Sequence, residues 1–131
     1  MTVQDYLHME TIPRNLSDIV QAIADCCIQI GEKVERAALD NHQGVVTSSS
    51  INSSGDEQKK MDVISNDIMM KALIGTGYCS ALLSEEDDYA VVVQEPSTNT
   101  CMVAFDPLDG SANMQSNINT GTIYAIYEYD S

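Results

Sequence analysis

The sequence predicts a layered α/β domain, with helices in the first half of the chain packed on a mixed β-sheet formed by the second half. Three observations lead to this fold class. Apolar residues recur every three or four positions over residues 15–40, which is typical of an amphipathic helix. Short apolar runs separated by turn residues follow position 78, which is typical of strands. The 131 residues, 44% of them apolar, suffice for a single domain with a modest core.

Two helices are predicted in the first half of the chain. The first begins at Asn15, which forms a cap-like pair with Asp18, and it stops near Gly44. The second runs from Asp62 to Ile74, with Asp62 as a helix cap and Gly75 ending the helix. We expect both helices to bury one apolar face in the core.

A serine-rich segment, Thr47–Gly55, lies between the two predicted helices. Its sequence, TSSSINSSG, offers too little apolar surface to be fixed by packing, so we expect it to be mobile. One interpretation is a solvated linker, and the other is a lid over a binding site.

Four strands are predicted in the second half, and residues 95–100 suit a hairpin-type link between the middle two. Their expected ranges are Cys79–Leu83, Tyr89–Gln94, Cys101–Phe105 and Asn119–Tyr129. The last strand is apolar on both faces and therefore suits the middle of a sheet. Because the sequence ends at Ser131, nothing in it can cover that strand, and we expect an exposed edge and an incomplete chain.

Composition excludes several classes of protein. The net charge is -14 and there are only six Lys and Arg residues, which argues against a nucleic-acid or membrane-surface partner. The four cysteines lack C-x-x-C spacing, so we expect reduced and mostly buried thiols. No signal peptide is evident, and no apolar run approaches the ~20 residues of a membrane span. We therefore expect a cytoplasmic protein, with a processed organellar form as the alternative.

The most informative stretch is FDPLDGSAN, Phe105–Asn113. Asp106 and Asp109 are close enough to repel each other unless a cation lies between them, and hard divalent cations prefer oxygen ligands. Gly110 and Ser111 then form a turn into a short helix, where backbone N–H groups favour a phosphate oxyanion. The stretch therefore predicts a metal site joined to a phosphate site.

Further carboxylates follow the ends of predicted strands. Glu85 and Glu86 follow the strand Cys79–Leu83, just as Asp106 follows the strand Cys101–Phe105. Residues beyond the strand ends of an α/β sheet line the crevice where ligands bind. Magnesium is favoured over zinc because no His or Cys has ligand spacing. Without the aspartate motif, residues 85–88 would be interpreted as a solvated acidic turn.

The motif FDPLDGSAN, followed by Gly121–Ile123, resembles the signature of class I fructose-1,6-bisphosphatases, which are lithium-sensitive, metal-dependent sugar phosphatases. Three upstream stretches match the same family in order, namely Gly55–Asp62, Ser65–Asp67 and Leu83–Asp87. The resemblance covers nearly the whole chain, but only the front part of that family.

The resemblance implies specific roles for these residues. The metal ligands would be Glu85, Asp106, Asp109 and the backbone carbonyl of Leu108, holding two or more Mg²⁺ ions, with Mn²⁺ as a substitute. The transferred phosphate would be held by Asp109, Gly110 and Ser111. The attacking water would be oriented and deprotonated by Glu86 and Asp62, and Asp56 would contribute from a mobile lid over about residues 43–61.

By the same resemblance, the implied activity is that of a phosphoric monoester hydrolase. It would convert fructose 1,6-bisphosphate to fructose 6-phosphate and phosphate, in gluconeogenesis or related sugar-phosphate metabolism, within a homo-oligomer such as a tetramer. The family's second domain, which holds the sugar, is absent from this sequence, so we expect weak or no activity from the isolated chain. The alternatives are a sedoheptulose-1,7-bisphosphatase, an inositol-monophosphatase-like enzyme, and a short non-catalytic protein that binds metal or pairs with a full-length subunit.

Overall fold

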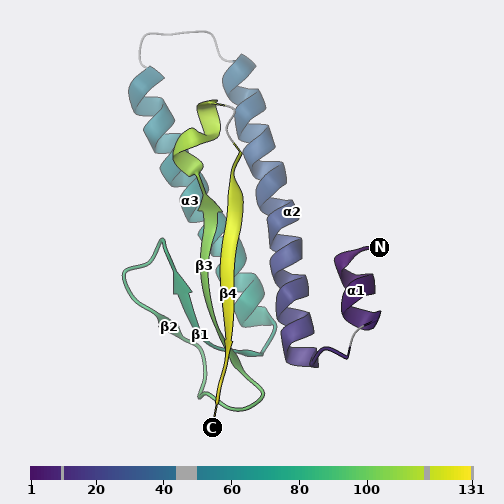
Figure 1. The fold of residues 1–131 in the computed structure, drawn as a ribbon. Helices are drawn as coiled ribbons and strands as arrows, with labels where there is room; N and C mark the ends of the chain where they lie inside the picture. The colour runs from purple at the N-terminus through teal and green to yellow at the C-terminus, as the bar shows by residue number, and fades with distance from the viewer. Residues whose placement is uncertain (10, 44–49, 117–118, 131) are drawn as a thin grey trace.

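A computed structural model describes residues 1–9, 11–43, 50–116 and 119–130. Two long helices lie on one side of a four-stranded mixed sheet, which confirms the predicted layered α/β class (Figure 1). In chain order the elements are α1 (Val3–Met9), α2 (Arg14–Gln43), α3 (Ser50–Gly75), β1 (Cys79–Ser84), β2 (Val91–Val92), β3 (Cys101–Asp109), the 3₁₀ helix η1 (Ser111–Ser116) and β4 (Gly121–Glu128).

The predicted first helix is confirmed as α2. The side-chain oxygen of Asn15 accepts the backbone N–H of Leu16 at 2.8 Å, and its Nδ2 donates to the carbonyl of Asn99 at 3.4 Å. This side chain therefore ties the start of α2 to the loop before β3. Asp18 forms an ion pair with Arg14 at 3.6 Å, one helical turn apart. The short helix α1, which the sequence did not predict, precedes α2.

The prediction that the second helix begins at Asp62 is wrong, because α3 begins at Ser50. Residues 50–55 of the predicted mobile segment are therefore helical, and Asp56 and Asp62 lie inside the helix. Serine and asparagine disfavour a helix by only about 0.5 kcal/mol each relative to alanine, which tertiary packing can offset. As a whole, α3 packs against α2, β3 and η1. Residues 44–49 of the predicted lid lie outside the described residues.

The sheet has the strand order β2-β1-β3-β4. β1 and β3 are parallel, while β2 and β4 run antiparallel to their neighbours. The predicted hairpin between β2 and β3 is wrong, because β2 turns back on β1 and pairs Val92 with Ala81. The acidic turn after β1 makes that reversal, and the chain then crosses to β3. As expected, β4 is an outer strand in the described part of the sheet.

The core lies between the helices and one face of the sheet. Side chains alternate along β3, where Cys101, Val103 and Phe105 are buried and Met102 is exposed. All four cysteines are free and three are buried, as predicted. No helix in the described ranges is long and apolar enough to cross a bilayer. The main buried apolar side chains are those of Ile19, Ile23, Cys26, Ile30, Met61, Met69, Leu73, Cys79, Leu82, Cys101, Val103, Phe105 and Leu108.

Candidate metal centre

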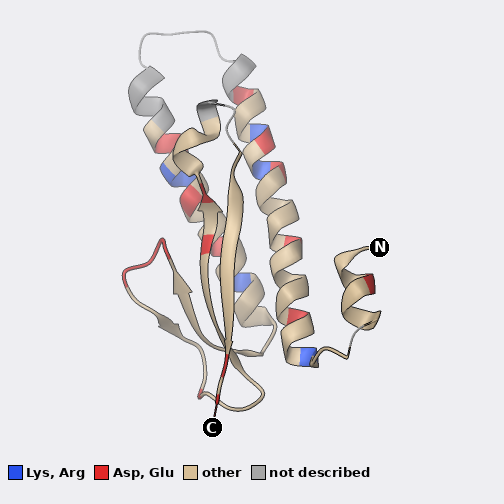
Figure 2. Ribbon diagram, viewed as in Figure 1, with Lys and Arg blue, Asp and Glu red and all other residues tan. Residues whose placement is uncertain are grey.

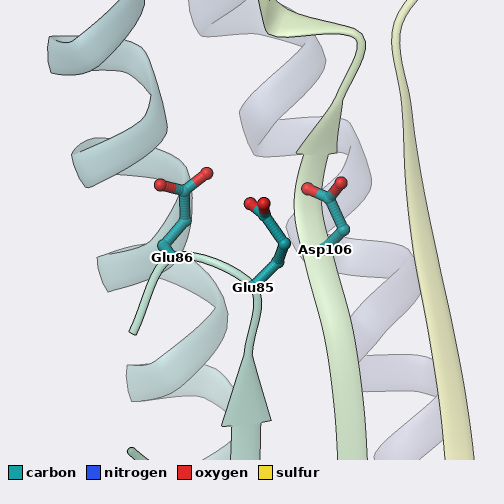
Figure 3. A group of neighbouring side chains, drawn as sticks. All are labelled: Glu85, Glu86 and Asp106. Carbon is teal, nitrogen blue, oxygen red and sulfur yellow. The ribbon is translucent and has the colours of Figure 1, made fainter. Parts of the chain in front are cut away.

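Three carboxylates meet at one edge of the sheet. Because β1 and β3 are parallel, their carboxyl ends lie side by side, and the N–H of Glu85 donates to the carbonyl of Phe105 at 3.0 Å. One carboxylate oxygen each from Glu85, Glu86 and Asp106 lies within 4.8 Å of the others (Figure 3). Figure 2 shows further acidic residues on the neighbouring stretch of α3. The strand ends thus bring three of the predicted site residues together.

Glu86 has the most perturbed carboxylate of this group. Partial burial raises its pKa to about 7, and the nearby charges of Asp62, Glu85 and Asp106 act in the same direction. The residue keeps one side open to solvent. A carboxyl group with such a pKa can take up or release a proton near neutral pH, which is what a general base requires.

Asp106 is held by its own turn. Burial raises the pKa of its carboxyl group, and the negative charges of Glu85, Asp109 and Asp62 raise it further. The backbone N–H of Leu108 donates to Asp106 Oδ1 at 3.1 Å and opposes that rise. Because the pKa of Asp106 remains raised in spite of this hydrogen bond, the bond does not fully offset burial and the neighbouring negative charges.

Asp62 reaches the same group from α3. It lies close enough to raise the pKa of both Glu86 and Asp106. Its Oδ1 atom is buried and has no hydrogen-bond partner among the described residues. Buried carboxylate oxygens normally have a partner, so an oxygen that lacks one beside three other acids fits a site for a cation.

The donor set suits a hard divalent cation. Every ligand available in this group is a carboxylate oxygen, which magnesium and manganese accept and which zinc sites rarely use alone. Among the described residues, no Lys or Arg forms an ion pair with Glu85, Glu86 or Asp106. A bound divalent cation would therefore balance the carboxylate charges of this group, which no described Lys or Arg side chain does.

Several polar residues on one face of α3 lie beside the site. Gln58, Asp62 and Asn66 are spaced four residues apart and therefore share this face. The side-chain amide of Gln58 donates to the Ser111 hydroxyl at 3.3 Å, and that of Asn66 donates to the Asp87 carboxylate at 3.2 Å. Asp56 is exposed and lies outside the carboxylate group.

The predicted phosphate half lies at the end of β3. Gly110 has a φ of +81°, and a Cβ on it would come 3.3 Å from the carbonyl oxygen of Asn119. Ser111 then begins the 3₁₀ helix η1, which confirms the predicted short helix. Asp109 lies outside the group of three carboxylates but close enough to raise the pKa of Asp106. The predicted metal and phosphate halves are therefore adjacent.

The side chain of Leu108 belongs to the core, while its backbone N–H contacts the Asp106 carboxylate. Next to it, the hydroxyl of Thr122 on β4 donates to the carbonyl of Pro107 at 3.0 Å. The strand register shifts between Asp106 and Asp109. This shift interrupts the regular pairing of β3 with β4 between the two aspartates.

Three residues near the site, Asn66, Ser84 and Gln58, were not predicted from the sequence as site residues. The signal for Asn66 was present, because it lies four residues after Asp62 and within the matched stretch Ser65–Asp67. Ser84 and Gln58 also lie within matched stretches, Leu83–Asp87 and Gly55–Asp62, but isolated serine and glutamine residues are common on surfaces, so their residue type alone does not indicate a site.

Comparison with known proteins bears on the family and the fold. The family profile described as fructose-1-6-bisphosphatase, N-terminal domain, matches residues 2–131. The chloroplastic fructose-1,6-bisphosphatase of Pisum sativum is 40% identical over 116 residues, which cover 88% of this chain and 28% of that protein. The chloroplastic enzyme of Oryza sativa subsp. indica is 38% identical over 117 residues, covering 89% of this chain and 28% of that protein. The chain thus spans little more than a quarter of the length of these relatives.

Solved structures share the fold. The holo form of Leishmania major fructose-1,6-bisphosphatase superposes with a TM-score of 0.76 at 23% identity, covering 100% of this chain and 39% of that one. The apo form gives a TM-score of 0.73 at 23% identity, covering 98% of this chain and 36% of that one. Both matches therefore cover a minor part of the solved chains.

Proposed function

The chain belongs to the fructose-1,6-bisphosphatase family, whose N-terminal domain profile covers residues 2–131, and from this premise we propose a metal-dependent sugar bisphosphatase. Its reaction would be hydrolysis of the 1-phosphate of fructose 1,6-bisphosphate to give fructose 6-phosphate and phosphate. The observation that carries the proposal is the group of Glu85, Glu86 and Asp106, with Asp62 beside it, at the adjacent ends of β1 and β3.

We assign the metal ligands to Glu85, Asp106, Asp109 and the carbonyl of Leu108. The proximity of Glu85 and Asp106 supports their part of this set. Two or more Mg²⁺ ions, or Mn²⁺ in their place, would offset the carboxylate charge and polarise the phosphate. Proton transfer and phosphate binding would be carried out by other residues of the site.

Glu86 and Asp62 would orient the attacking water and accept its proton. The raised pKa of Glu86, about 7, supports this role because it is close to the operating pH of most enzymes. Gly110, Ser111 and Asp109 would hold the transferred phosphate. Asp56 would join them from the first turns of α3, which form the helical part of the proposed lid over about residues 43–61.

We expect the isolated chain and a full-length protein to differ in activity, because the chain matches only part of its relatives' length. Because the matched segment covers 28% of the pea relative, we propose that the isolated chain binds metal weakly and hydrolyses little or no substrate, while a full-length protein is active. We also propose that the full-length protein is a homo-oligomer and acts on a small sugar bisphosphate. The alternatives of a sedoheptulose-1,7-bisphosphatase, an inositol-monophosphatase-like enzyme and a non-catalytic metal-binding chain become outcomes of the test.

The test begins with the transcript beyond the codon for Ser131, because an open continuation defines the protein to be assayed. Phosphate release is then measured from fructose 1,6-bisphosphate, sedoheptulose 1,7-bisphosphate and inositol 1-phosphate, with Mg²⁺ and with a chelator. We expect Mg²⁺-dependent release that is fastest with the fructose ester, and its loss in Asp106→Asn but not in Glu32→Gln, an exposed acid on α2. Release that ignores Mg²⁺ would contradict the metal mechanism, and robust release by the isolated chain would contradict the expected difference in activity between it and a full-length protein.

The cytoplasmic location stays a prediction. The pea and rice relatives are chloroplastic proteins, which corresponds to the organellar alternative. Cell fractionation with an antibody against this chain would distinguish the two compartments.

A further inference from the structure

Asn66 is bonded at both ends of its side-chain amide. The Ser84 hydroxyl donates to Asn66 Oδ1 at 2.7 Å, and Asn66 Nδ2 donates to the two carboxylate oxygens of Asp87 at 3.2 and 3.3 Å. An ionised carboxylate only accepts hydrogen bonds, so the nitrogen end must face Asp87 and the oxygen end must face Ser84. The orientation of the amide is therefore fixed by its partners.

The two residues that Asn66 contacts flank the two glutamates of the site in the sequence. Glu85 and Glu86 lie between Ser84 and Asp87 in the sequence, so Asn66 holds the residue before them and the residue after them. The Ser84 hydroxyl also accepts the backbone N–H of Glu86 at 3.2 Å. The backbone position of Glu86 is thus connected to α3 through two hydrogen bonds in series.

Two backbone hydrogen bonds also hold this turn, from the Glu85 N–H to the Phe105 carbonyl and from the Asp87 N–H to the Ser84 carbonyl, but neither joins it to α3. Residues 85–90 are all exposed, so apolar burial does not anchor them. The carboxylates of Glu85, Glu86 and Asp106 repel one another, and Asp62 adds to that repulsion. Unrestrained, the turn would move away from Asp106 and α3, which would separate the ligands before a cation arrives.

From these contacts we propose that Asn66 is a positioning residue that fixes the Ser84–Asp87 turn against α3 and so sets the spacing of Glu85 and Glu86 to Asp62 and Asp106. Asn66 lies four residues after Asp62 on the same helical face, so one helix positions both the turn and Asp62. A neutral amide suits the position because it offers an acceptor to Ser84 and a donor to Asp87. The link to metal binding rests on the proposed function, whereas the ordering of the turn does not.

The first test compares the Mn²⁺ affinity of the 131-residue chain with that of Asn66→Ala, measured by the electron paramagnetic resonance of free Mn²⁺. Partners that orient metal ligands commonly contribute 10- to 100-fold in affinity, so we expect a loss of about 10-fold. Gln21→Ala is the matched control, because it removes an amide that donates to Asp25 one turn along α2, at 2.9 Å and away from the carboxylate group. An unchanged affinity in a folded Asn66→Ala chain would overturn the proposal.

A second test separates positioning from general stability. The double variant Asn66→Asp, Asp87→Asn keeps the net charge and exchanges the donor and the acceptor, so a hydrogen bond across the pair can form again. We expect it to recover the Mn²⁺ affinity that Asn66→Ala loses, even if its melting temperature stays below that of the wild type. An affinity as weak as that of Asn66→Ala would show that the paired amide and carboxylate do not set the spacing.

The third test uses no metal and therefore stands apart from the proposed function. Hydrogen exchange of the Glu86 amide, which bonds to Ser84, is measured by NMR in the metal-free chain. We expect exchange to be about fivefold faster in Asn66→Ala and unchanged in Gln21→Ala. If the wild-type chain binds no Mn²⁺ but this difference appears, the positioning role stands and the metal function fails. If Mn²⁺ binds and the exchange rates are equal, the positioning role fails alone.

Discussion

The backbone N–H of Leu108 donates a hydrogen bond of 3.1 Å to the Oδ1 atom of Asp106 across the intervening Pro107. This short turn lowers the pKa of Asp106 while burial and the neighbouring acids raise it. The sequence Asp-Pro-Leu-Asp therefore fixes one carboxylate oxygen through its own backbone. The direction of the Asp106 side chain is thereby set locally, at the end of a buried strand.

Removing this carboxylate should greatly weaken metal binding by the chain. We expect Asp106→Ala to weaken Mg²⁺ and Mn²⁺ binding by at least about 100-fold, because losing a ligand costs more than losing a residue that merely orients one. Isothermal titration calorimetry measures the change, with the exposed α2 residue in Glu32→Ala as the charge-matched control. Binding that is equally strong in Asp106→Ala would disprove the assignment of the site.

Much of this site follows from the sequence, because local patterns encode it. Apolar residues three and four positions apart predict α2, and carboxylates placed directly after apolar runs predict that Glu85 and Asp106 meet at a sheet edge. That meeting requires only that β1 and β3 be parallel neighbours, which the structure shows.

The rest depends on packing between distant segments. Ser50 begins α3 although the residues after it have low helix propensity, because the helix packs against β3 and η1. Val92 pairs with β1 and not with β3, and neither strand's own pattern distinguishes the two partners. The bonds of Asn66 to the turn after β1 also join segments that are separate in sequence.

The stability of the metal-free chain should fall as the pH rises towards 8, in part because of Glu86. In the folded chain the pKa of Glu86 is raised from 4.5 to about 7, so the folded state binds this proton more tightly than the unfolded state. The contribution is therefore fully present below about pH 4.5 and is lost as the pH rises through 7. Glu86→Gln should flatten this part of the profile and make the chain more stable than the wild type at pH 8.

Urea unfolding at pH values between 5 and 8 measures this effect. Asp106 also has a raised pKa and stays in the variant, so the difference between the two proteins reports Glu86 together with its charge interactions with Asp106 and Asp62. Glu32→Gln controls for the loss of one negative charge elsewhere on the surface. Parallel pH profiles for the wild type and Glu86→Gln would contradict the raised pKa.

The stability of the chain should depend on the Leu82 side chain, which lies on the strand that leads to the site. This β1 side chain is 0% exposed and lies in the core two residues before Ser84, whereas Val92 on β2 is 79% exposed. We expect Leu82→Ala to lower the free energy of unfolding by about 2 to 5 kcal/mol, while Val92→Ala changes it by less than about 0.5 kcal/mol. Denaturant titrations followed by circular dichroism measure both, and similar effects would show that β1 is not the buried strand described.

Gly110 should be intolerant of a side chain, unlike a helical glycine of the same chain. It has a φ of +81°, and an added Cβ would come 3.3 Å from the backbone oxygen of Asn119, which cannot move aside as a side chain could. The left-handed conformation alone costs a residue with a Cβ about 1 to 2 kcal/mol, so Gly110→Ala should destabilise the chain by at least that amount. Gly31 lies within α2, where an added Cβ would meet nothing within 4 Å, and Gly31→Ala should instead stabilise by about 0.5 to 1 kcal/mol. Urea unfolding of the two variants should therefore give changes of opposite sign, and a neutral or stabilising Gly110→Ala would mean that the turn between β3 and η1 does not require a left-handed residue.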